Sequence, residues 1–216
     1  MNLVVPLIRQ EKGSSDCGLA CIGMILKYYG IKKSIEEIKK DVEVFEGGTY
    51  MPQLGNYFLS QNFEVEIITM NPHLFNASFK KTSQKKMLSY LEKKREAVQK
   101  ESQKRCITFF IEFLQAGGKL TIAPPTTTNI KSEMKHKRPV LALLTSAVLS
   151  KKAIQFNFHY NVITGIDSKH IIVNDPGAGV LGGKHTYPID DYLYALYASA
   201  HGEGDNASMM KIRYKK

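Results

Sequence analysis

The stretch SSDCGLACIGMILKYYG, from Ser14 to Gly30, decides the fold of this chain more firmly than any other part of its sequence. Capping residues at its start are followed by apolar residues at helical spacing, and Gly30 provides a stop. We therefore predict a helix over about residues 17–29. Its apolar positions fall on two stripes, which indicates a helix buried on most sides.

Cys17 lies at the start of this predicted helix, where unpaired backbone N–H groups favour a thiolate over a thiol. The same N–H groups could hold an oxyanion, and the small Gly18 leaves room for a substrate carbonyl. The position therefore allows a nucleophile, although an inert core cysteine would fit it as well. We expect Cys21, one turn further along, to be core, and Cys106 has no visible partner.

A cysteine nucleophile needs a base, and the base needs an orienting group. His159 begins a predicted strand over 158–166, and Asp175 ends the next strand of the same hairpin. With a three-residue turn at 167–169, Asp175 faces Asn161 and lies diagonal to His159 on the same face, about 7 to 8 Å away. A four-residue turn would put the two on opposite faces. The pairing therefore requires an odd-numbered turn or a bulge, and a satisfied core histidine is the alternative.

The remaining pattern indicates an α+β domain in which N-terminal helices pack on an antiparallel sheet. Ser34 and Glu37 form a capping box for a short helix, and a third helix is predicted over 52–60. Alternation of apolar and acidic residues over 63–67 predicts a strand with one solvent-exposed face. The continuous apolar run 140–144 predicts a strand buried on both faces. A short helix at 132–137, a last helix after Pro188 and a closing strand over 209–214 complete the expected fold.

Composition excludes several classes of protein. The 216 residues are 43% hydrophobic and 23% charged, which is typical of an ordinary globular domain and not of a disordered chain. The longest nearly apolar stretch, 139–149, is far shorter than the roughly 20 residues of a membrane-spanning helix. The first residues show no basic region before their apolar stretch and no small-residue cleavage site after it, so we expect no secretory signal. The three cysteines are an odd number and contain no zinc-binding pair, and we therefore expect a cytoplasmic protein.

The formal net charge is +10, and much of it lies in one segment. Residues 80–105 carry ten Lys or Arg against three Glu, on one long or two shorter amphipathic helices that end at Gly117 and Gly118. A solvated helical face and a docking surface for an acidic partner both fit this pattern. We expect no nucleic acid partner, because aromatic residues are not interleaved with the basic ones.

The motif DCGLAC at 16–21, continued by MILKYYG at 24–30, resembles the nucleophile helix of the C39 and C39-like cysteine peptidases. This family is known for domains that remove double-glycine leaders from bacteriocin precursors. Three later motifs resemble its central strand (RPV, 138–140), its histidine strand (HYNVITG, 159–165) and its aspartate turn (VNDP, 173–176). The resemblance covers most of the chain outside about residues 74–130.

This resemblance implies a papain-like fold over a single domain, 1–216, with a basic helical insertion at about 74–130. It also implies a cysteine peptidase in which Cys17 is the nucleophile, His159 the general base and acid, and Asp175 its orienting group. The family's oxyanion donor is a glutamine, for which Gln10 is the candidate. Gln10 lies one position further from Cys17 than the pattern has it, so a bulge at 13–15 or a purely backbone oxyanion hole is needed.

We accordingly expect a stand-alone thiol hydrolase that acts on a peptide or protein substrate without metal or organic cofactor. The transporter helices usually fused to bacteriocin-processing members do not occur in this sequence. Two other activities remain open: transfer of the acyl group to an amine or thiol, as in a transpeptidase, and peptide binding by a peptidase fold without turnover. The oligomeric state and the substrate sequence are not predicted.

Overall fold

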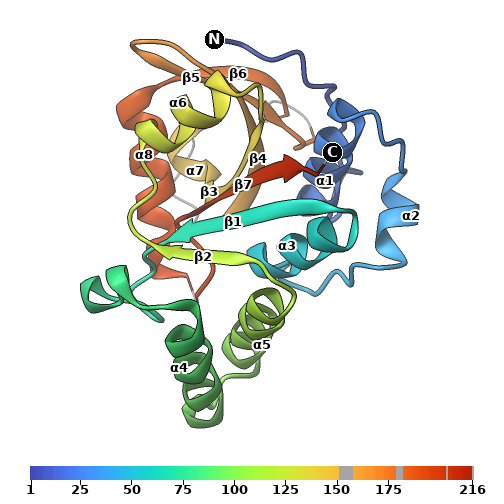
Figure 1. The fold of residues 1–216 in the computed structure, drawn as a ribbon. Helices are drawn as coiled ribbons and strands as arrows, with labels where there is room; N and C mark the ends of the chain where they lie inside the picture. Colours follow the sequence, from blue (N-terminus) through green and yellow to red (C-terminus); the bar gives the residue numbers. More distant parts are fainter. Residues whose placement is uncertain (151–157, 179–181, 203, 216) are drawn as a thin grey trace.

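A mixed sheet of seven strands forms the centre of the protein in the computed structural model, which describes residues 1–150, 158–178, 182–202 and 204–215 (Figure 1). The order across the sheet is β2-β1-β7-β3-β4-β5-β6. Neighbours pair antiparallel except for β1 and β2, which are parallel. The strands are β1 (Phe63–Thr69), β2 (Lys119–Ile122), β3 (Val140–Thr145), β4 (Phe158–Ile166), β5 (His170–Asp175), β6 (Gly183–Pro188) and β7 (Ser208–Tyr214).

Helices cover both faces of this sheet (Figure 1). In chain order they are α1 (Cys17–Tyr28), α2 (Ile35–Lys39), α3 (Met51–Ser60), α4 (Gln84–Ala97), α5 (Glu101–Gln115), α6 (Thr127–Lys135), α7 (Ser146–Leu149) and α8 (Ile189–Ala198), with short 3-10 helices η1 (Ala77–Lys81) and η3 (Ser199–His201). One core contains α1, α3, α4 and α5, and the other contains α6 and α8. The α+β class expected from the sequence is therefore confirmed, although the sheet is mixed where an antiparallel one was expected, because β1 and β2 pair in parallel.

Strand β3 shows how the sequence produces two cores. Its side chains alternate between the faces, so Leu141 and Leu143 join the core beneath α1 and α3 while Val140, Ala142 and Leu144 join the core beneath α6 and α8. Every residue of the strand is buried. Residues 140–144 are all apolar, as expected for a strand in a sheet that is covered on both faces.

The basic segment folds as two helices that pack against each other, α4 and α5, and α5 in turn packs on α3. The apolar side of α4 is buried through Met87 and Leu91. The segment 74–130 also contains β2, which pairs in parallel with β1 and was not predicted. None of the helices in the described residues has the length and apolar character that crossing a bilayer requires.

Candidate active site

The first turn of α1 presents Cys17 at the surface of an otherwise buried helix. Residues 18–26 are all buried, whereas Cys17 is only partly buried. The preceding residue, Asp16, is 4% exposed, and its carboxylate is bound by Lys39 Nζ of α2 at 2.7 Å. The helix start is therefore fixed by an ion pair, and its thiol is the one side chain of the turn that faces outward.

Gly18 allows the loop at 47–49 to lie directly against this helix start. A Cβ atom at this position would overlap the hydroxyl oxygen of Thr49 and lie 3.0 Å from Cδ1 of Leu54. The loop carries Gly48 at φ +95°, a conformation that favours glycine. Two glycines thus bring a loop backbone close to the side of Cys17.

His159 and Asp175 meet on neighbouring strands. Nε2 of His159, near the start of β4, lies 2.8 Å from Oδ1 of Asp175, at the end of β5. The same carboxylate oxygen accepts the backbone N–H of Gly177 at 2.7 Å. The side chains of the pair are 14% and 6% exposed, so the hydrogen bond is largely shielded from water. The imidazole is consequently held in one orientation by a carboxylate that is itself held by the backbone.

The hairpin reaches this arrangement by a different route from the predicted one. The three-residue turn is wrong: the N–H of Asp167 donates to the carbonyl of His170, so the turn has two residues and Ile166 faces Ile171. That register alone would put the histidine and aspartate on opposite faces. A bulge between Ile163 and Gly165 shifts the register by one. Beyond it the pairing is the one that the sequence argument required.

The environment of His159 favours its charged form. Burial alone would lower the pKa of this imidazole, but hydrogen bonds and charges from Asp175 and Cys17 outweigh burial and raise the pKa to about 10. Cys17 therefore lies close enough to the ring to interact with it directly. An imidazolium between a carboxylate and a thiol is the arrangement that stabilises a thiolate.

Gln10 lies beside the aspartate turn. Its backbone N–H donates to the carbonyl of Pro176 at 2.8 Å, and its Nε2 donates to the carbonyl of Ser14 at 2.7 Å. A turn closed by the N–H of Ser14 and the carbonyl of Glu11, with Gly13 at φ +83°, accommodates the extra residue of this segment. An amide nitrogen carries two hydrogens, so the second N–H of Gln10 is left for another acceptor.

A pocket of about 240 Å³ opens next to Cys17. Its walls include Gly48 and Tyr50 of the glycine loop, Phe158 and Tyr160 of β4, and Asp205. Asp205, in the segment between η3 and β7, was missed by sequence reasoning. It had no local signal, because the groups that bind it come from residues 51 and 160.

Residues 5–105 match the Peptidase C39 family. Over this segment, which is just under half of its length, the chain is similar to the C39 peptidases. The match contains Cys17 and Gln10, whereas His159 and Asp175 lie beyond it, so the second half of this C39-like chain is compared through its fold. No curated protein matches it by sequence.

Solved structures of C39 peptidase domains share the fold of this C39-like chain over nearly all of its length. A double-glycine-motif protease from an AMS/PCAT transporter, solved with the leader peptide, has 14% identity and a TM-score of 0.52 over 99% of this chain and 94% of its own. The peptidase domain of Streptococcus ComA, a bifunctional ABC transporter in a quorum-sensing pathway, has 13% identity and a TM-score of 0.51 over 97% and 98%. A C39-like peptidase from Bacillus anthracis has 12% identity and a TM-score of 0.54 over 100% and 98%.

Proposed function

We propose that this protein is a cysteine peptidase that cleaves a peptide or amide bond through an acyl-enzyme on Cys17. The observation that carries the proposal is the juxtaposition of Cys17, at a helix start, with an imidazole whose Nε2 is bound by Asp175 at 2.8 Å. Family and fold support a peptidase-type function, and the roles of the individual residues are our inference.

In the proposed reaction, the Cys17 thiolate attacks the scissile carbonyl and forms a tetrahedral oxyanion. Because Nε2 of His159 is engaged by Asp175, Nδ1 is the nitrogen that gives its proton to the leaving amine as the C–N bond breaks. The imidazole then takes a proton from water, whose oxygen attacks the thioester. Collapse of the second intermediate breaks the C–S bond, releases the acid and expels the Cys17 thiolate, which leaves the thiolate–imidazolium pair as it was at the start.

The oxyanion requires hydrogen-bond donors close to Cys17. The first backbone N–H groups of α1 have no intrahelical acceptor, since the first helical bond runs from Ala20 to the carbonyl of Asp16. We propose that the N–H of Cys17 is one donor and that the second N–H of the Gln10 amide is the other. Removing one such donor typically costs about 10²- to 10³-fold in rate.

Alkylation of Cys17 at low pH tests the proposal directly. At pH 6, iodoacetamide should modify Cys17 of the wild-type protein about 100-fold faster than Cys17 of His159→Ala, because an ordinary thiol is almost fully protonated there. Peptide mass spectrometry measures the two rates and reports Cys106 as a buried internal control. Equal rates in the two proteins, or modification of Cys17 no faster than of Cys106, would contradict an activated nucleophile and favour a peptide-binding module without turnover.

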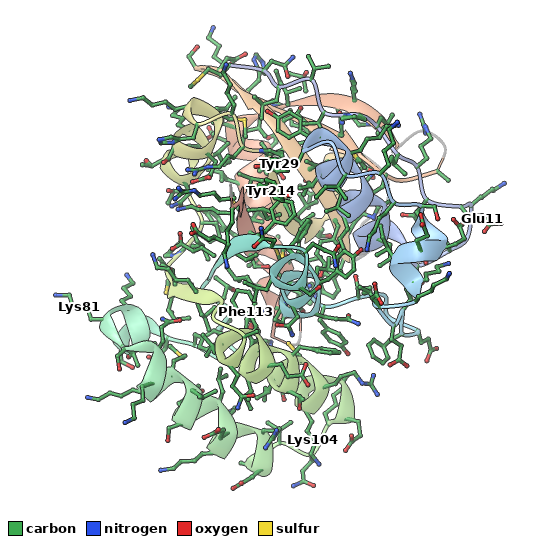
Figure 2. The ribbon with its side chains drawn as sticks, turned by 45° about the vertical axis from the view of Figure 1, so that its right-hand side comes forward. Glu11, Tyr29, Lys81, Lys104, Phe113 and Tyr214 are labelled. Carbon is green, nitrogen blue, oxygen red and sulfur yellow. The ribbon has the colours of Figure 1, made fainter. Side chains whose placement is uncertain are left out.

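We also propose that the substrate carries an acidic segment that binds the basic side chains on the exposed side of α4 and at the end of η1, just before it. Most of this face is exposed, and Figure 2 shows Lys81 extending away from the molecule. Within the described residues these cations form no ion pair with a carboxylate. Ser102, at the start of α5, lines the pocket beside Cys17, so the hairpin of α4 and α5 reaches the site. The basic face consists of Lys80, Lys81, Lys85, Lys86, Lys93, Lys94 and Arg95.

Charge reversal on this basic face should weaken binding of an acidic peptide. The double variant Lys85→Glu/Lys93→Glu is expected to raise Kd about tenfold at low salt, since each exposed pair contributes up to about 1 kcal/mol. The matched control is Lys131→Glu/Lys135→Glu, two exposed residues of α6 on the other side of the sheet. Fluorescence anisotropy with an aspartate-rich peptide measures both. Equal weakening in the two variants would indicate a general effect of net charge and no docking surface.

We propose the cytoplasm as the compartment of this protein. All three cysteines are free, and cytosolic proteins keep their thiols reduced.

A further inference from the structure

Asp205 is a buried carboxylate with no cationic partner in the part of the chain that the structure describes. Its residue is 7% exposed, and no Lys, Arg or His among the described residues forms an ion pair with it. Burial raises the pKa of this carboxyl to about 6, against hydrogen bonds that lower it. A buried charge is costly unless it is paired, so binding of a cationic group next to this carboxylate would be favourable.

The hydrogen bonds of Asp205 leave one of its oxygens available. Oδ2 accepts the N–H of Met51, at the start of α3, at 2.7 Å and lies 3.5 Å from the hydroxyl of Tyr160. Oδ1 accepts no hydrogen bond from another described residue, and apart from these two groups only the N–H of Asp205 itself interacts with the carboxylate. Capping α3 therefore accounts for Oδ2 alone, and a neutral asparagine could perform that role.

The carboxylate lies in the wall of the pocket that also contains the nucleophile. The pocket of about 240 Å³ corresponds to several water molecules at about 30 Å³ each, which is room for a side chain. Tyr50, Phe158 and Tyr160 supply aromatic walls, and aromatic faces attract cations as well as apolar stems. An acidic group with aromatic walls is suited to a long side chain that is apolar along its stem and cationic at its tip.

We propose that this pocket accepts a lysine or arginine side chain of the substrate adjacent to the scissile bond, and that Asp205 determines this specificity. The inference rests on the proposed function and adds its substrate class. The cation would pair with Oδ1 while its stem lies between the aromatic rings. The basic face of α4 and the acidic pocket would then select different parts of one peptide: an acidic segment outside and a single cationic residue at the cleavage point.

A lysine scan tests the proposal. Peptides of glycine and alanine that carry one lysine at successive positions are incubated with the wild-type protein, and the products are identified by mass spectrometry. Cleavage should occur at a fixed offset from the lysine, and replacing this lysine by norleucine should lower kcat/KM about 50-fold, as expected for loss of one buried charge pair. Cleavage that does not follow the lysine overturns the inference.

Asp205→Asn separates specificity from structure, because the asparagine oxygen can still accept the N–H of Met51. The variant should cut the lysine and norleucine peptides at similar rates, so that the roughly 50-fold lysine preference of the wild-type protein is lost. Asp191→Asn, an exposed acid of α8, is the matched control and should keep the lysine preference. An unchanged preference in Asp205→Asn, or an equal loss for both peptides, overturns the inference.

Binding distinguishes this inference from the proposed function. In Cys17→Ala, the lysine peptide should bind about 50-fold more tightly than the norleucine peptide whether or not the wild-type protein turns peptides over. Lysine-selective binding without any cleavage would overturn the peptidase and support the pocket. Cleavage without lysine selectivity would support the peptidase and overturn the pocket.

Discussion

Replacing Cys17 by serine is expected to lower kcat/KM by at least about 10⁴-fold for any peptide that the protein cleaves. A serine hydroxyl has nearly the same size as the thiol, but the adjacent imidazole cannot ionise it, so the variant retains the geometry and loses the nucleophile. Losses of this order follow removal of a nucleophile in enzymes whose catalytic groups act as a unit. Since Cys17 is partly exposed and its neighbours in α1 are buried, the fold should not change.

Peptide cleavage followed by mass spectrometry measures this loss, and thermal unfolding verifies the fold. Cys21→Ala is the control: this residue lies one turn along the same helix and is fully buried, so its replacement should cost stability and leave kcat/KM within a few-fold of the wild-type value. A Cys17→Ser protein with a tenth of the wild-type activity would contradict the acyl-enzyme on Cys17.

The parts of the fold that the sequence predicted are those whose signals are local. The capping box of Ser34 and Glu37 is present, because both of its hydrogen bonds involve residues only three positions apart. Helix α1 and strand β3 were predicted because their burial on all sides appears as uninterrupted apolar patterning. For these elements, knowledge of the neighbouring segments adds little.

The elements that were missed lie at the sheet edges. Strand β2 has only four residues, and β6 alternates a few half-buried side chains with exposed ones up to Pro188. Such short edge strands gain most of their stability from backbone pairing with β1 and β5, which apolar patterning does not reveal. The alternation that predicted the interior strands is therefore weak in both.

In the candidate site, too, some residues could be predicted from local sequence and others could not. Cys17 and Gly18 could be identified from one short motif, whereas the relation of His159 to Asp175 depended on a register that the turn alone does not determine. The predicted turn was wrong and the required shift came from a bulge at 163–165, which no local residue pattern specified. Asp205 could not be found at all, because its importance depends on burial against two distant segments.

Replacing Asp175 should have the second largest effect on catalysis. In Asp175→Ala the imidazole of His159 loses the acceptor of its Nε2–H, so we expect kcat/KM to fall about 10³-fold. Asp175→Asn keeps an oxygen that can accept this hydrogen bond and still bind the N–H of Gly177, so it should lose only about tenfold. If the two variants were equally impaired, orientation through this hydrogen bond would not be the role of Asp175.

The pH profile gives an independent test of the same residue. Burial lowers the pKa of His159, while Asp175 and Cys17 raise it to about 10, so removing Asp175 leaves burial less opposed and the pKa must fall. The imidazolium that protonates the leaving amine is then lost at lower pH. The alkaline limb of kcat/KM should therefore move from near pH 10 toward neutrality in Asp175→Ala and by a smaller amount in Asp175→Asn. An alkaline limb that stays in place or moves upward in Asp175→Ala would show that the carboxylate does not stabilise the charged imidazole, and a purely structural role would then suffice.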